Sequence, residues 1–186
     1  MRRLAALLCF VVACGPSDGP KGDVGPAGPA GPIGAQGSAG PAGTTGQDVI
    51  EGVGTGQIQV SGATNFSAIP GLTITVNVPP NAKLHVDTSG GIQCTGTGNA
   101  YSAVDIAIFV DGSITNAQRR VVAANTAGVA QMIASWSFGR FLLLAPGSHT
   151  IEVRAAGGDP AMTIANVSSA SAPQLQGVLT ATILKQ

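Results

Sequence analysis

Residues 19–48 read GPKGDVGPAGPAGPIGAQGSAGPAGTTGQD, which is ten Gly-X-Y triplets without interruption. Only glycine fits the crowded axis of three wound polyproline-II chains, so a strict period of three is what a triple helix requires. Every proline of the stretch directly follows a glycine, where its restricted φ is close to the value of that helix. The stretch predicts a triple-helical stalk and a homotrimer. Its repeat glycines are Gly19, Gly22, Gly25, Gly28, Gly31, Gly34, Gly37, Gly40, Gly43 and Gly46.

This repeat resembles the collagen-like stalks of bacterial surface proteins. At roughly 3 Å of rise per residue, thirty residues would form a rod of about 90 Å. A flexible Pro/Gly linker is the alternative, although such linkers show no constant period. Because ten triplets are few and no Y position carries proline, we expect the domain that follows the stalk to assist trimer formation.

The stalk is preceded by a predicted signal peptide. Arg2 and Arg3 form a positive start, and the nine apolar residues 4–12 are far fewer than the roughly 20 of a membrane-spanning helix. Residues 11–14, VVAC, resemble the lipobox of bacterial lipoproteins. That resemblance implies removal of residues 1–13, acylation (palmitate) of Cys14, and a lipid-anchored N-terminus over residues 14–18. The absence of aspartate after Cys14 favours the outer membrane in such lipoproteins, and cleavage by signal peptidase I is the alternative.

Charge and cysteine content narrow the possible partners. The chain has 9 Lys+Arg and 9 Asp+Glu, and loss of Arg2 and Arg3 would leave a mildly acidic protein. Nucleic acid is therefore not expected as a partner. With Cys9 removed and Cys14 acylated, Cys94 is the remaining cysteine, which excludes an intrachain disulfide. Cys94 is expected to be buried and inert, and a reactive thiol or an interchain bond is the alternative.

Residues 49–56 are predicted to be a connector, and residues 57–186 a β-rich head domain. In LTITVNV, residues 72–78, apolar and polar residues alternate as in a half-buried strand. Three hairpins are expected. The first joins 72–78 to 83–88 through Pro79-Pro80-Asn81, the second joins 104–110 to 119–124 through Asp111-Gly112, and the third joins 131–144 to 149–155. Residues 161–167 and 177–184 complete eight to ten strands.

Many short antiparallel strands with regular turns predict an all-β fold, a jelly-roll-like antiparallel β-sandwich. A collagen-like stalk followed by a β-domain of this size resembles the organisation of the complement C1q and tumour-necrosis-factor superfamily. That resemblance implies jelly-roll heads that trimerise through their faces.

The sequence offers little for catalysis. His85 and Asp87 share a strand face and could in principle exchange protons, but such pairs are commonly part of a solvated face. His149 follows a turn, where an imidazole often bonds a backbone carbonyl. Asp105, Asp111 and Asp159 lack the spacing of a calcium loop. We expect no enzyme activity, no cofactor and no metal.

A basic patch is a second candidate site. Its residues would be Arg119, Arg120, Arg140 and Arg154, binding an acidic glycan or a phosphate, with ordinary solvated arginines as the alternative. The sequence as a whole predicts a lipid-anchored trimer at the outer membrane or cell surface whose stalk displays the head for structural or adhesive contacts. The alternative is a ligand-binding head that recognises a glycan or peptide.

Overall fold

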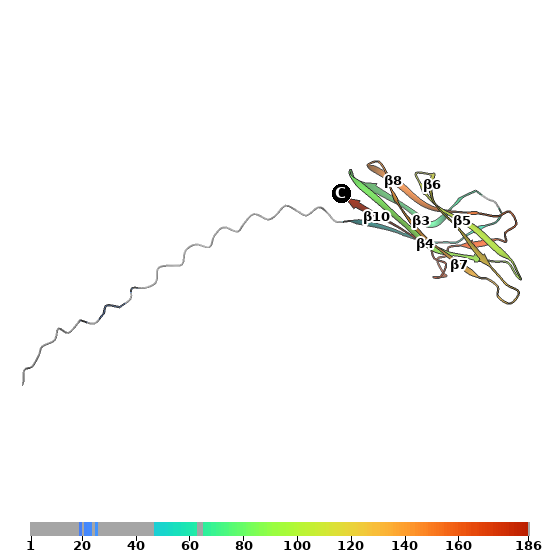
Figure 1. Ribbon diagram of the computed structural model, residues 1–186, viewed down its shortest axis with the longest axis horizontal. Coiled ribbons are helices and arrows are strands. Elements are labelled where there is room, and N and C mark those ends of the chain that lie inside the picture. The colour runs from blue at the N-terminus through green and yellow to red at the C-terminus, as the bar shows by residue number, and fades with distance from the viewer. Residues whose placement is uncertain (1–18, 20, 24, 26–46, 63–64, 186) are drawn as a thin grey trace, which may run out of the picture. The chain divides into compact units, whose positions relative to one another are not determined.

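The computed structural model describes residues 19, 21–23, 25, 47–62 and 65–185, and all of its strands belong to the head (Figure 1). In the described part of the chain there is no helix, and hence none long and apolar enough to cross a membrane. The strands are β1 (Asp48–Val53), β2 (Ile58–Val60), β3 (Ser67–Val78), β4 (Ala82–Cys94), β5 (Tyr101–Val110), β6 (Ser113–Ala124), β7 (Ile133–Leu142), β8 (Gly147–Gly157), β9 (Ala165–Val167) and β10 (Val178–Lys185).

These strands form two antiparallel sheets. Sheet A contains β1-β10-β4-β9-β2, with β7 paired to the other edge of β4. Sheet B has the order β3-β8-β5-β6. The eight main strands pair from the two ends of the chain inward: β1 with β10, β3 with β8, β4 with β7, and β5 with β6. The all-β, antiparallel prediction is confirmed, and apolar side chains of both sheets share one core.

Alternation along the strands builds that core. Leu72, Ile74, Val76 and Val78 are buried on one face of β3, while the residues between them are exposed, as the sequence predicts. β10 shows the same period of two, whereas β5 also buries Ala103, Ala107 and Phe109 on its other face. The largest fully buried residues are Ile69, Leu72, Leu84, Ile92, Ile106, Ile108, Ile151 and Leu179. Each contributes about 1.5–3 kcal/mol through burial.

The hairpin between β5 and β6 is confirmed. Asp111 and Gly112 form its two-residue loop, with φ values of 50° and 76°. Positive φ at both positions is the condition for a type I′ turn, which glycine and aspartate tolerate.

Two other expected hairpins are wrong. β3 and β4 belong to different sheets, and so do β7 and β8. Residues 79–81 and the segment before Gly147 therefore cross from one layer to the other. The alternation of Leu84 and Val86 places both residues in the core as expected, but alternation does not distinguish a neighbour in the same sheet from a neighbour across the core.

The segment expected as a connector, residues 49–56, is largely a strand. Asp48 through Val53 pair with β10, and Ile50 packs against the core. Glycines at 52, 54 and 56 give this segment the composition of a linker. Gly52 faces Gly71 and Ile74 of β3 so closely that a Cβ would collide with them, so this glycine serves packing. The sheet therefore begins at Asp48, the last residue of the Gly-X-Y repeat.

Cys94 lies at the end of β4, fully buried and as a free thiol. This burial agrees with the inert role expected from sequence. An interchain disulfide would require the thiol to reach the surface, so the alternative of a cross-link between chains is not favoured.

Candidate functional site

The predicted anchor and most of the repeat lie outside the described residues. Cys14 is among them, as are the repeat glycines from Gly28 to Gly46. Gly19, Gly22 and Gly25 are described and exposed, and a Cβ on any of them would meet nothing within 4 Å. The candidate sites that can be built from contacts therefore belong to the head.

The outer face of sheet A is arranged in rows by strand register. One row contains Val49 of β1, Thr182 of β10, His85 of β4 and Phe141 of β7. The rings of His85 and Phe141 pack with centroids 4.3 Å apart. Val49 follows the first residue of β1, so this row lies at the end of the sheet where the Gly-X-Y repeat joins the head.

An apolar patch occupies this end of the face. We define it as Val49, Phe141, Leu143 and Leu184. The first three are 62%, 59% and 79% exposed, which is unusual for side chains that favour burial. Phe141, Leu143 and Leu184 line, with Lys83, a hollow of about 530 Å³. Such contiguous exposed apolar surface commonly marks an interaction site.

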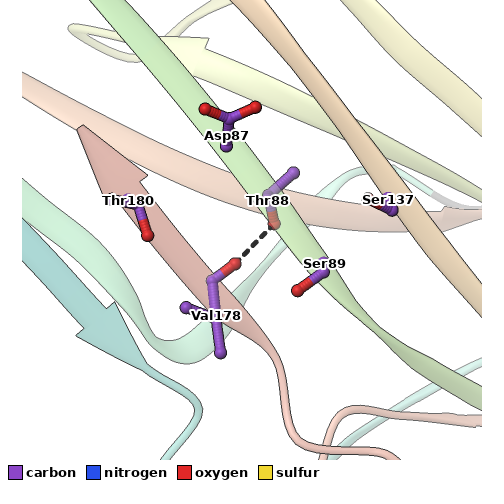
Figure 2. A pocket seen from close by; sticks show the side chains of 6 residues that line it. All are labelled: Asp87, Thr88, Ser89, Ser137, Val178 and Thr180. Carbon is purple, nitrogen blue, oxygen red and sulfur yellow. Dashed lines mark hydrogen bonds between the residues drawn. The ribbon is translucent and has the colours of Figure 1, made fainter. Parts of the chain in front are cut away.

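Farther along the same face the surface becomes polar. A hollow of about 110 Å³ lies between β10, β4 and β7, lined by Asp87, Thr88, Ser89, Ser137, Val178 and Thr180 (Figure 2). Thr88 donates a hydrogen bond to the Val178 carbonyl at 2.9 Å and accepts one from Trp136 Nε1 at 3.1 Å. Both bonds involve the Thr88 hydroxyl, so this polar group has its partners within the protein. Asp87 is the charged residue among those that line the hollow.

His85 and Asp87 share the outer face of β4, as expected. Their Nδ1 and Oδ2 atoms lie 2.9 Å apart. The imidazole also packs on Phe141, and the carboxylate lies over Gly139 of β7, where a Cβ would collide with it. The pair is thus a partly exposed side-chain contact that packs on the neighbouring strand β7.

His149 makes two contacts. Its Nε2 lies 2.8 Å from the Ala145 carbonyl and its Nδ1 lies 2.7 Å from Oδ2 of Asp111. The carbonyl contact matches the expectation from sequence, and the carboxylate contact is additional. The hydrogen bond with Asp111, followed by that with Ala145, raises the pKa of His149. The same hydrogen bond lowers the pKa of Asp111, helped by the Thr150 amide.

The three aspartates considered as calcium ligands lie apart and bind protein groups. Asp105 pairs with Arg120 at 2.8 Å, Asp111 with His149, and Asp159 accepts a hydrogen bond from the Ala161 amide at 2.8 Å. Asp159 also bonds Tyr101, which raises the pKa of that phenol. Across 47–62 and 65–185, no three His, Cys, Asp or Glu residues gather as a metal site would require.

The four arginines do not form one basic patch. Arg119 and Arg120 are consecutive in β6 and therefore point to opposite faces of sheet B. Arg120 binds Asp105, and Arg154 binds Glu152 while its guanidinium lies 4.4 Å from the ring centroid of Phe109. Arg119 and Arg140 instead line one small hollow between β6 and β7.

Sequence reasoning missed the apolar patch, although a signal is present. Residues 141–144 read FLLL, so both faces of the strand end are apolar. Leu142 and Leu144 pack against the core, which leaves Phe141 and Leu143 on the opposite face. An apolar run without alternation at a strand end therefore signals a second, outward apolar surface. The chain matches no protein-family model and no curated protein.

Proposed function

We propose that this protein is a lipid-anchored homotrimer of the bacterial outer membrane or cell surface, in which a collagen-like stalk displays three β-sandwich heads for structural or adhesive contacts. One observation carries the proposal. The last Gly-X-Y triplet ends at Asp48, the first residue of β1, and the apolar patch lies on the strand rows where β1 begins. The stalk and the surface that would join the heads meet at the same end of sheet A.

The strand order supports a jelly-roll head. In a jelly roll, a long antiparallel ribbon whose outermost strands pair with each other is wrapped into two four-stranded layers. The eight main strands pair in that manner, with β1-β10-β4-β7 in one layer and β3-β8-β5-β6 in the other. This arrangement is compatible with the C1q and tumour-necrosis-factor organisation that the sequence resembles.

The position of the apolar patch supports trimer contacts through sheet A. Three chains of a triple helix end side by side, so three copies of β1 would begin close to one axis. Phe141 and Leu143 would then be buried between heads rather than left in water. Such contacts would supply the assistance that a repeat of ten triplets requires.

The period of the repeat also favours three chains. Within one chain, a Cβ at Gly19, Gly22 or Gly25 would meet nothing within 4 Å beyond its chain neighbours. Packing inside the chain therefore does not explain the glycine at these three described positions. Close approach of two further chains at a triple-helix axis does explain it.

The proposed anchor is the acylated Cys14. A single acyl chain binds a membrane reversibly, whereas several chains on each of three subunits hold essentially permanently. Multivalency would act in the same way at the other end of the stalk. Three linked heads would bind a surface more tightly than one head whose single contacts are weak.

Light scattering on the soluble protein from residue 15 onward tests this proposal, together with circular dichroism of the triple helix and its melting. A trimer with a cooperative collagen transition is the expected result. A monomer without that transition would reduce the repeat to a tether and leave a single-headed binding domain as the better explanation.

A further inference from the structure

Two arginines occupy core-facing positions on the open edges of the sandwich. Arg119 alternates with the buried Ala117 and Val121 of β6, and Arg140 follows Phe138 by two residues in β7. β6 is the edge strand of sheet B, and among the described strands β7 is paired only to β4. The two edge strands are in contact, and Arg119 and Arg140 border the same space.

That space is a hollow of about 80 Å³. Arg119 and Arg140 line it together with Asn116, Ala117, Gln118, Phe138 and Gly139. By strand alternation the side chains of Asn116 and Gln118 point to the face of β6 opposite to Arg119. Among the described residues, none of those that line the hollow is an aspartate or a glutamate. Sites for whole drug-sized ligands are about 300–1,000 Å³, so this hollow has room for one functional group rather than for a complete ligand.

The charge of the hollow is not balanced from within the described part of the chain. The other two head arginines that were candidates for a patch are paired, Arg120 with Asp105 and Arg154 with Glu152. Arg119 and Arg140 take part in none of the ion pairs found over residues 47–62 and 65–185. The carboxylate of Asp87 approaches Gly139 on the outer face of sheet A, on the other side of the strand.

We infer that Arg119 and Arg140 form a binding site for an oxyanion, a sulfate or carboxylate group carried by an acidic saccharide. Two guanidinium groups suit a planar or tetrahedral oxyanion because each offers paired donors. The exposed part of Phe138, which is partly buried against the core, offers an apolar surface to a sugar ring. This inference goes beyond the display function proposed above and is independent of it, since every lining residue comes from one chain.

Inward-pointing charges on edge strands also prevent sheets from pairing edge to edge. That role alone would require no ligand and no particular neighbour for either arginine. It therefore predicts no saturable binding of an anion at this place, which separates it from the inferred site.

The experiment uses three probes that share one backbone: dextran sulfate, carboxymethyl-dextran and neutral dextran. Isothermal titration on the soluble protein from residue 15 onward, at about 150 mM salt to screen long-range attraction, gives the affinity for each. The variants are Arg119→Gln and Arg140→Gln. Arg119→Lys and Arg140→Lys are second variants, which keep the positive charge but lose the paired donors of the guanidinium group. Arg120→Gln is the matched control, because it makes the same change of charge at the next residue of β6 on the opposite face.

We expect saturable binding of one or both charged dextrans and none of neutral dextran. Each glutamine variant should weaken binding about tenfold or more, since hydrogen bonds to charged groups are the strong ones. The affinities of the lysine variants should lie between those of the glutamine variants and the wild type. The affinity of Arg120→Gln should stay within about twofold of the wild-type value. The inference is overturned by equal loss in Arg120→Gln, by unchanged binding in the Arg119 and Arg140 variants, or by the absence of saturable anion binding. The comparison of sulfate with carboxymethyl groups identifies the oxyanion.

Discussion

His149 ties β8 to the turn between β5 and β6, because its Nδ1 lies 2.7 Å from Oδ2 of Asp111. The other ring nitrogen faces the Ala145 carbonyl, and Oδ1 of Asp111 accepts a hydrogen bond from the Thr150 amide at 2.8 Å. Both ring nitrogens thus face acceptors. The imidazolium form, which donates from both nitrogens, is the form that this geometry satisfies.

The first prediction concerns pH. The folded state raises the pKa of His149 above 6.5, so its stabilising contribution is complete below that value and is lost as pH rises through the raised pKa. The folded state lowers the pKa of Asp111 below 3.8, so its contribution is present above that value and is lost as pH falls through the lowered pKa. Both contributions are present between about pH 4 and 6.5.

Thermal unfolding from pH 4 to 9 measures this effect. We expect the Tm of the head to fall by a few degrees as pH rises from 6 to 9, and His149→Gln to remove most of that fall. His85→Gln is the control, because it changes the other histidine and should keep the pH dependence. An unaltered pH profile in His149→Gln would contradict the prediction.

The second prediction concerns the buried bonds of Thr88. Thr88→Val removes the hydroxyl that donates to the Val178 carbonyl and accepts from Trp136 Nε1. The buried Trp136 Nε1 and the part-buried Val178 carbonyl would lose this partner, so we expect a loss of about 1–3 kcal/mol in the free energy of unfolding. Chemical denaturation measures it. Thr88→Ser keeps the hydroxyl and should cost clearly less, and equal losses would show that methyl packing matters as much as hydrogen bonding.

The third prediction compares two glycines with positive φ. Gly71 has a φ of 84°, and a Cβ there would collide with the Val53 carbonyl and the Thr55 amide. Gly112 has a φ of 76° and open space around it. Gly112→Ala should therefore cost only the backbone strain, about 1–2 kcal/mol. Gly71→Ala should cost more than about 3 kcal/mol, because β1 and β3 must also move apart. Similar losses of unfolding free energy for the two variants, measured by denaturant titration, would show that β1 and β3 can move apart at little cost.

The fourth prediction addresses assembly through the apolar patch. The double variant Phe141→Ser and Leu143→Ser should lower the stability of the proposed trimer, because it removes apolar surface that the proposed contact would bury. Light scattering over a dilution series should show dissociation at higher protein concentration than for the wild type. Val122→Ser, which changes an exposed apolar residue of sheet B, is the control. An unchanged dilution curve would place the trimer contact elsewhere.

The fifth prediction concerns the anchor. If the proposal is right, Cys14→Ala should abolish acylation and release the protein from the membrane fraction, because the thiol proposed to carry the acyl chains is gone. Mass spectrometry and labelled palmitate measure it. Cys9→Ala is the matched control and should leave both properties intact. Retention of the label in Cys14→Ala would contradict the proposed lipobox.

Local patterns predicted the strands well, and the sheet arrangement poorly. The alternation at 72–78 and the Asp111-Gly112 turn are properties of a few adjacent residues, and both are confirmed. Whether β4 lies beside β3 or across the core from it depends on contacts between residues far apart in sequence. Apolar alternation is equally satisfied by both arrangements, so two of three expected hairpins were wrong.

The candidate sites show the same difference between features set by adjacent residues and features set by residues far apart in sequence. The contact of His149 with a carbonyl depends on a nearby turn, and it was predictable. The meeting of Arg119 with Arg140 depends on the pairing of two edges, and the neutralisation of Arg120 and Arg154 depends on where Asp105 and Glu152 lie. Composition made residues 49–56 look like a linker, since three glycines there outweigh the apolar alternation around Ile50.

The place of β10 has a consequence for the order in which the head is made. β10 is the last of the described strands, yet it lies in sheet A between β1, the first of them, and β4 (Figure 1). During synthesis or export, β1 emerges first and finds its partner only when the residues up to Lys185 have followed. A head whose last residues have not yet been made or exported therefore lacks the strand that joins β1 to β4 in sheet A. If the heads align the stalk, its three chains would be wound from the head toward the anchor, opposite to the direction in which they are made.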